Sequence, residues 1–213
     1  MTRTTVPVPL LMLVTDAARL RGRSLESVVD AAVGGGVNAV QLRERELPHD
    51  ELTALATRLR AAIGGRALLL VNGDGSAARA SGADGVHLPE AGASIAETRR
   101  RAGETMLISR AVHGMDAAVA AVRDGADMLV LGTVFASASH AGAATIGVEG
   151  VRAVCASVRA PVIAIGGVTA GNARDVVRAG AAGVAVIGAI FGATDARLAA
   201  AELRAAISLP VRA

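Results

Sequence analysis

The stretch PVIAIGGVTAGNARDVVRAGAAGVAVIGAIF, residues 161–191, decides the fold. Two apolar runs within it, residues 161–165 and 184–187, predict buried strands, and residues 172–178 between them predict a short amphipathic helix. Continuous apolar strands are typical of a parallel sheet that is covered on both faces. The stretch therefore predicts a βαβ unit.

Glycines stand where both of these strands stop. Gly166 and Gly167 follow the first run, and Ile187 and Gly188 end the second. A position without a Cβ lets backbone N–H groups approach a ligand, and a short helix that begins at Gly188 would direct further N–H groups to the same place. We interpret these four residues as a candidate phosphate site. The same glycines could instead serve only close packing between helix and strand.

The rest of the chain repeats this pattern of strand and helix. Eight repeats in 213 residues give about 27 residues for each unit, which is typical of a (β/α)₈ barrel. We predict one TIM barrel domain over residues 1–213. The alternative is an open, doubly wound sheet, but no GxGxxG motif follows the first strand. The remaining predicted strands are residues 10–15, 39–43, 67–71, 85–88, 106–112 and 128–131, and the remaining helices are residues 25–32, 50–63, 76–80, 95–101, 116–123, 148–158 and 195–207.

The composition excludes several classes of function. All 22 basic residues are arginines, so enzymes that need a Schiff-base, pyridoxal or Walker-type lysine are excluded. A net charge of +3 that is spread along the chain is not typical of nucleic-acid binding. Cys155 is the one cysteine, which excludes an internal disulfide and indicates a reducing cytoplasm. The apolar run at residues 10–14 is too short to cross a membrane. We expect a cytoplasmic protein with a small-molecule ligand and without a metal, a cofactor or a nucleic-acid partner; a homodimer is compatible with the sequence.

The four histidines all follow predicted strand ends, and none falls in a predicted helix. They are His49, His87, His113 and His140. Barrel enzymes carry their chemistry at the carboxyl ends of the strands, so this placement predicts one active face. Each histidine taken alone is more often a structural residue than a catalyst.

The second strand carries polar residues on alternate positions of VQLRER, residues 40–45. Gln41, Arg43 and Arg45 share one face, which we expect to point into the barrel. An inward guanidinium is costly unless it meets an anion, which indicates an anionic ligand. The alternative is an internal ion pair with Asp16 or Glu44.

Seven strings along the chain form a recognisable set: VQLRER, VNGD, GVHLPE, AVHG, LGTVFASASH, AIGGVT and AVIGAIF. In this order and at these spacings they resemble the thiamine phosphate synthase superfamily, and its thiazole tautomerase branch most of all. The resemblance implies a (β/α)₈ barrel that binds a thiazole phosphate, with the phosphate at Gly166, Gly167, Ile187 and Gly188. The other substrate-binding residues that it implies are Gln41, Arg43, Arg45, Asn72, Arg110, Ser137, Ser139 and His140, with the three arginines as candidates for a substrate carboxylate.

Four departures from the synthase pattern concern the pyrophosphate half of the site. Synthases carry two Mg²⁺-binding aspartates where this chain has Gly73 and Gly92. Ala111 replaces a synthase serine, and residues 137–140 replace a TxTK loop. These departures favour the tautomerase, an isomerase that moves a proton of a carboxythiazole ethyl phosphate without a metal.

His113 matches the catalytic histidine of the tautomerase, and an imidazole can take and return a proton near neutral pH. Synthases often carry a histidine there as well. Two alternatives stay open. One is a thiamine phosphate synthase that couples hydroxymethylpyrimidine pyrophosphate to thiazole phosphate, with Asp74 and Glu90 as improvised Mg²⁺ ligands. The other is a non-catalytic barrel that binds thiazole or thiamine phosphate.

Overall fold

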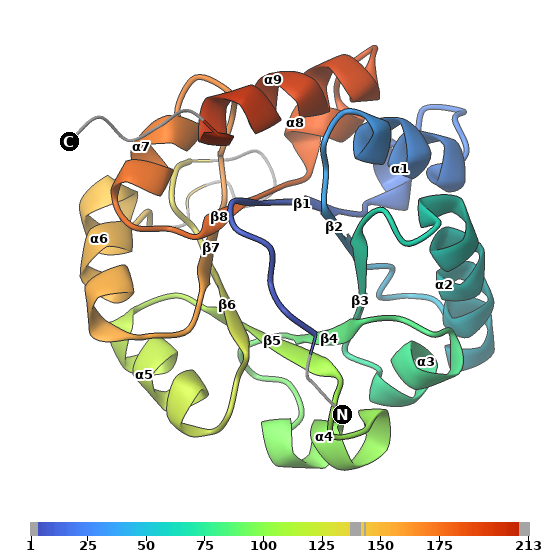
Figure 1. Cartoon of the computed structure of the whole chain (residues 1–213), viewed down its shortest axis with the longest axis horizontal. Helices are drawn as coiled ribbons and strands as arrows, with labels where there is room; N and C mark the ends of the chain where they lie inside the picture. Colours follow the sequence, from blue (N-terminus) through green and yellow to red (C-terminus); the bar gives the residue numbers. More distant parts are fainter. Residues whose placement is uncertain (1–3, 137–141, 143, 209–213) are drawn as a thin grey trace.

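The computed structural model of the chain describes residues 4–136, 142 and 144–208. Eight parallel strands close into a barrel in the order β1 to β8, because β8 pairs with both β7 and β1, and helices surround the barrel (Figure 1). The predicted single (β/α)₈ barrel is confirmed. The strands are β1 (Leu10–Val14), β2 (Ala39–Leu42), β3 (Leu68–Asn72), β4 (Gly85–Leu88), β5 (Leu107–Val112), β6 (Met128–Leu131), β7 (Val162–Ile165) and β8 (Gly183–Val186).

The helices follow the predicted order, and their ends differ from the prediction by one or two residues. Two short elements stand outside the regular repeat: the 3₁₀ helix η1 after β1, and α8, which begins at Gly188 as expected. The elements are η1 (Ala17–Arg19), α1 (Leu25–Gly34), α2 (His49–Ile63), α3 (Gly75–Ala80), α4 (Ile95–Ala102), α5 (Met115–Arg123), α6 (Gly147–Ser157), α7 (Ala173–Arg178), α8 (Gly188–Phe191) and α9 (Ala196–Ser208).

The expectation that no histidine lies in a helix is wrong for His49, which is the first residue of α2. Asp50 and Glu51 follow it in the first turn, where carboxylates stabilise the positive end of the helix dipole. The helix therefore begins one residue earlier than the apolar pattern indicated.

Two apolar clusters form the core, one between the sheet and the helices and one inside the barrel. On β1 the side chains alternate: Leu11 and Leu13 pack toward the helices, whereas Leu10, Met12 and Val14 fill the barrel. Polar residues replace this filling on β2, β4 and β5, where Gln41, His87 and Ser109 are buried. The barrel is thus closed by apolar residues, with a polar layer that leads to the carboxyl ends of the strands.

Among the described residues, no helix combines the length and the apolar character that crossing a membrane requires.

Candidate functional site

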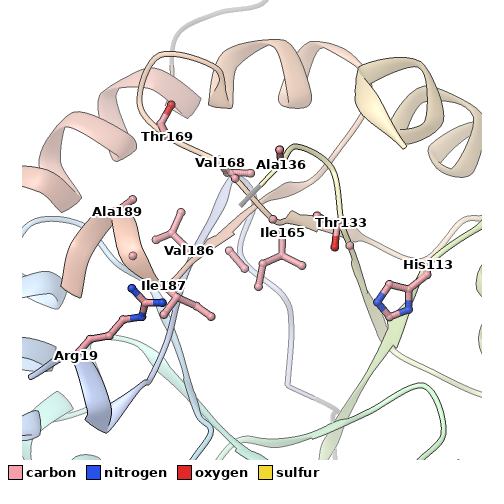
Figure 2. A pocket seen from close by; sticks show the side chains of 15 residues that line it. Arg19, His113, Thr133, Ala136, Ile165, Val168, Thr169, Val186, Ile187 and Ala189 are labelled. Atoms are coloured by element: carbon pink, nitrogen blue, oxygen red, sulfur yellow. The ribbon is translucent and has the colours of Figure 1, made fainter. Parts of the chain in front are cut away.

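The larger of two adjoining cavities lies at the carboxyl ends of β7 and β8 and has a volume of about 470 Å³. Figure 2 shows its side chains, which come from the ends of β7 and β8 and from the segments that follow β1, β5, β6, β7 and β8. Four of its lining residues are the predicted phosphate contacts Gly166, Gly167, Ile187 and Gly188. The full lining is Arg19, His113, Gly132, Thr133, Ala136, Ile165, Gly166, Gly167, Val168, Thr169, Ala185, Val186, Ile187, Gly188 and Ala189.

The glycines of this cavity fall into two kinds. Gly166 and Gly167 have φ angles of 102° and 64°, and an added Cβ would lie 2.8 Å from Thr133 Cγ2 and 2.5 Å from the Ala136 oxygen. Close packing therefore requires glycine at both positions, but the packing is against the segment after β6 and not between a helix and a strand. At Gly188, an added Cβ would approach, among the described atoms outside its chain neighbours and the backbone of α8, Arg19 Nη1 alone within 4 Å, at 3.9 Å. Packing does not explain Gly188, which opens onto the cavity.

The second cavity, of about 200 Å³, occupies the mouth of the barrel. It is lined by Gln41, Arg43, Arg45 and Asn72. The first three are the residues that alternation along the second strand placed on one face, although β2 itself ends at Leu42. The two cavities adjoin, because four residues line both of them: His113, Gly132, Ile165 and Ile187.

The barrel mouth is electropositive. Burial lowers the pKa of Arg43, and the charge of the neighbouring Arg45 lowers it further. The charges of Asp16 and Glu44 raise the pKa of Arg43 in part. Asp16 accepts from Arg19 Nε at 2.7 Å, and Glu44 accepts from Thr15 Oγ1 at 2.7 Å. A third carboxylate, Glu90, lines the cavity. Two clustered guanidiniums repel each other, and an anion bound between them offsets this repulsion. The cavity therefore favours an anionic ligand.

The floor of the mouth is polar but uncharged. His87 is 5% exposed, and its Nδ1 lies 3.0 Å from Ser109 Oγ. Burial, followed by the charges of Arg110, Arg43 and Arg45, lowers the pKa of His87 to about 3. His87 is therefore neutral at physiological pH. Beside it the amide of Gln41 donates to Asn72 Oδ1 at 3.4 Å.

His113 lies on the boundary between the two cavities, and its Nδ1 is hydrogen-bonded to Glu90 Oε2. A carboxylate on one ring nitrogen fixes the orientation of the imidazole and leaves the other nitrogen for a ligand. His113 Nε2 faces the cavity side, 4.0 Å from where a Cβ on Gly132 would stand. Glu90 had a role only in the Mg²⁺ alternative, and its string GVHLPE gave no signal for this partnership.

Arg110 lies outside both cavities, contrary to its predicted substrate-binding role. Its guanidinium donates to the backbone oxygens of Pro89 and Ala93 at 2.7 and 2.8 Å. The reason is strand parity: Ser109 reaches His87 inside the barrel, so the next residue points outward. Arg110 thus holds the loop that carries Glu90. The predicted contacts Ser137, Ser139 and His140 lie outside the described residues.

The residues at the implied Mg²⁺ site do not fit a divalent cation. Gly73 and Gly92 offer no side-chain oxygen, and the adjacent Asp74 is committed to the protein. Its Oδ1 caps α3 by accepting from the Ala77 N–H at 2.8 Å, and its Oδ2 lies 2.7 Å from His49 Nδ1. Mg²⁺ requires several oxygen ligands in octahedral geometry. Among the described residues no group of three or more His, Cys, Asp or Glu side chains could hold a metal ion.

Fold and cavities together define a (β/α)₈ barrel with a glycine-lined cavity at the end of its last two strands and an arginine-lined one beside it. A profile of the family described as thiamine monophosphate synthase matches residues 11–190, and the chain belongs to this family.

Its relatives share the name of that activity. A thiamine-phosphate synthase of Chloroflexus aurantiacus is 41% identical over 93% of each chain, and one of Methanoculleus marisnigri is 39% identical over 91% of this chain and 93% of that one. The solved structure of a thiamine phosphate pyrophosphorylase from Pyrococcus furiosus has a TM-score of 0.85 and 36% identity, covering 93% of this chain and 95% of the other.

These relatives overturn the expected assignment to the thiazole tautomerase branch, and with it the isomerase class. The tautomerase assignment depended on four substituted positions. Over its whole length, however, the chain is similar to proteins named as synthases. Gly73 and Gly92 show which side chains this barrel does not use. They do not by themselves identify the reaction, because a barrel can bind an anion with other residues, such as Arg43 and Arg45, which follow β2.

Proposed function

We propose that the protein is a transferase that forms thiamine phosphate by joining hydroxymethylpyrimidine pyrophosphate to thiazole phosphate. The observation that carries this proposal is the pair of adjoining cavities, since a reaction of two anionic substrates needs two anion-favouring sites that meet. The names of the relatives support the same reaction.

In this proposal each cavity takes one substrate. Thiazole phosphate lies in the larger cavity, with its phosphate at Gly166, Gly167, Ile187 and Gly188. The pyrimidine lies over the uncharged floor formed by Gln41, Asn72 and His87, with its pyrophosphate toward Arg43 and Arg45. Ser137, Ser139 and His140 are proposed as further substrate contacts from the loop after β6.

The reaction exchanges one bond for another. The bond between the pyrimidine methylene carbon and the pyrophosphate oxygen breaks, and its electron pair leaves with pyrophosphate. The ring nitrogen of the thiazole donates its lone pair to the same carbon and becomes a cationic nitrogen. Arg43 and Arg45 stabilise the charge that develops on the leaving group, as preorganised donors do in other transfer reactions.

We propose His113 as the catalytic side chain, because it stands where the two substrates meet. With Glu90 bonded at Nδ1, a protonated imidazole donates from Nε2 to the departing pyrophosphate. No step in this scheme passes through a metal ion, since the available donors do not fit one.

The direct test is to incubate the purified protein with both substrates and to measure thiamine phosphate and released pyrophosphate in parallel. We expect both products in equal amounts. A folded protein that releases neither would overturn the proposal. We further propose a reducing, cytoplasmic location, which the single free Cys155 supports, while a homodimer stays a prediction.

A further inference from the structure

Arg19 comes from the opposite end of the chain to the glycines, yet it lines the same cavity. It is the last residue of η1, and its Nη1 lies 3.9 Å from the place where a Cβ on Gly188 would stand. Figure 2 shows its guanidinium end beside Ile187. The pattern of the sequence gave Arg19 no role, because it falls between predicted elements.

The guanidinium is held in this place by its neighbours. Asp16 Oδ2 accepts from Arg19 Nε at 2.7 Å, which orients the planar group. Arg23, four residues later, donates to the backbone oxygens of Phe191 and Ala193 at 2.6 and 3.1 Å. The segment after β1 is thus fastened to the far end of α8, and Arg19 is carried to the beginning of that helix.

The charge of Arg19 complements the ligand of the proposed reaction. Of the described residues that line this cavity, Arg19 alone has a permanently charged side chain. A phosphate monoester carries between one and two negative charges at neutral pH. Backbone N–H groups offer partial charges only, and a guanidinium presents planar donors whose geometry suits phosphate oxygens. The chain has no lysine to take this part.

We propose that Arg19 binds the phosphate of the thiazole substrate, and that it selects the phosphorylated thiazole over the unphosphorylated alcohol. Asp16 is a positioning residue that orients the guanidinium. The inference rests on the proposed function only in the identity of the ligand. It requires phosphomonoester binding in this cavity, and it does not require the transfer reaction to proceed.

The test compares two ligands by calorimetry, thiazole phosphate and its unphosphorylated alcohol, in the absence of the pyrimidine substrate. Charge-assisted hydrogen bonds typically contribute enough to change affinity by about 10- to 100-fold. In Arg19→Gln we expect thiazole phosphate to bind more weakly by that factor and the alcohol to bind as in the wild type. Arg21→Gln is the matched control, since it removes the same charge from an exposed residue of the same loop and should change neither affinity.

Two further variants keep the test decisive should Arg19→Gln fold poorly. Arg19→Lys retains the charge but loses the planar donors, so its affinity for thiazole phosphate should fall between those of the wild type and of Arg19→Gln. Asp16→Asn should lower the affinity for thiazole phosphate by several-fold and leave the affinity for the alcohol unchanged. An unaltered preference for thiazole phosphate in folded Arg19→Gln or Arg19→Lys would overturn the inference, as would a wild type that binds both ligands equally. Because no coupling is measured, failure of the transfer reaction would leave these outcomes distinguishable.

Discussion

The two cavities are built from different parts of the polypeptide. Around the larger one the predicted phosphate contacts are mostly glycines, so the backbone faces the ligand. Around the barrel mouth the contacts are the side chains of Gln41, Arg43, Arg45 and Asn72. Where a site is formed by tightly packed backbone, substitution of a glycine adds atoms that have no space. Where a site is formed by side chains, a substitution can change the ligand contacts while the barrel stays folded. One of the departures from the synthase pattern, Ala111, lies in this mouth.

His113 joins the two cavities, and its loss should have the largest effect. General acid catalysts typically contribute about 10²- to 10⁴-fold to turnover, so His113→Asn should lower coupling by that much while both substrates still bind. Steady-state rates per folded molecule measure this. Glu90→Gln, which keeps the size of the partner but not its charge, should have a smaller effect in the same direction. Normal turnover in folded His113→Asn would remove His113 from the reaction.

The next largest effect concerns the two kinds of glycine. Gly188→Asp places a carboxylate against the phosphate and beside Arg19, and we expect affinity for thiazole phosphate to fall by about 100-fold, or about 3 kcal/mol, with the barrel still folded.

Gly167→Ala is the contrasting variant. Its Cβ would lie 2.5 Å from the Ala136 oxygen at a φ of 64°, so the free energy of unfolding should drop by about 1–3 kcal/mol. Calorimetric titration and denaturant unfolding of both variants separate the two effects. If Gly167→Ala kept full stability, the distinction between packed and open glycines would fail.

The floor of the mouth predicts a pH dependence of stability. Burial and the nearby arginines lower the pKa of His87 to about 3, whereas in the unfolded chain it has its ordinary value of 6.5. Between these values the unfolded chain binds a proton that the folded chain does not. Stability from this residue is therefore complete above pH 6.5 and falls by about 1.4 kcal/mol for each pH unit below it.

Urea unfolding at about pH 7 and pH 5 measures this loss, which should be about 2 kcal/mol greater in the wild type than in His87→Gln. His49, whose pKa is raised by its hydrogen bond to Asp74, changes stability in the opposite sense but equally in both proteins. An equal pH dependence of the two proteins would show that His87 titrates normally in the fold.

The smallest effect is expected from removal of divalent cations. Gly73 and Gly92 supply no ligand, and Asp74 caps α3, so EDTA should leave the coupling rate within about 2-fold of its original value. A loss of activity that added Mg²⁺ restores would contradict the metal-free reaction scheme.

The sequence predicted the barrel because its strands are buried apolar runs, and it predicted the arginines of the mouth because alternate residues of a strand share a face. Arg110 came from the family resemblance and not from this rule, and the inward parity that Ser109 sets on β5 would have excluded it from the barrel. Arg19 was missed because its place beside Gly188 joins residues from opposite ends of the chain. The reaction was misassigned because Gly73 and Gly92 show only that two side chains are missing. They do not indicate which reaction the remaining residues catalyse.

The pairing of β1 with β8, the seam of the barrel, determines when the larger cavity can form during synthesis of the chain. Leu10 pairs with Gly183, and Arg19 meets Gly188 just beyond that pairing, so the cavity needs residues from the first and the last repeat of the barrel. During synthesis on the ribosome, the cavity is therefore complete only after the eighth repeat has been made. A ligand that binds only across this seam also favours the closed ring over every opened form, by mass action. Newly made chains should therefore be protected from proteases soonest in cells that are rich in the substrate.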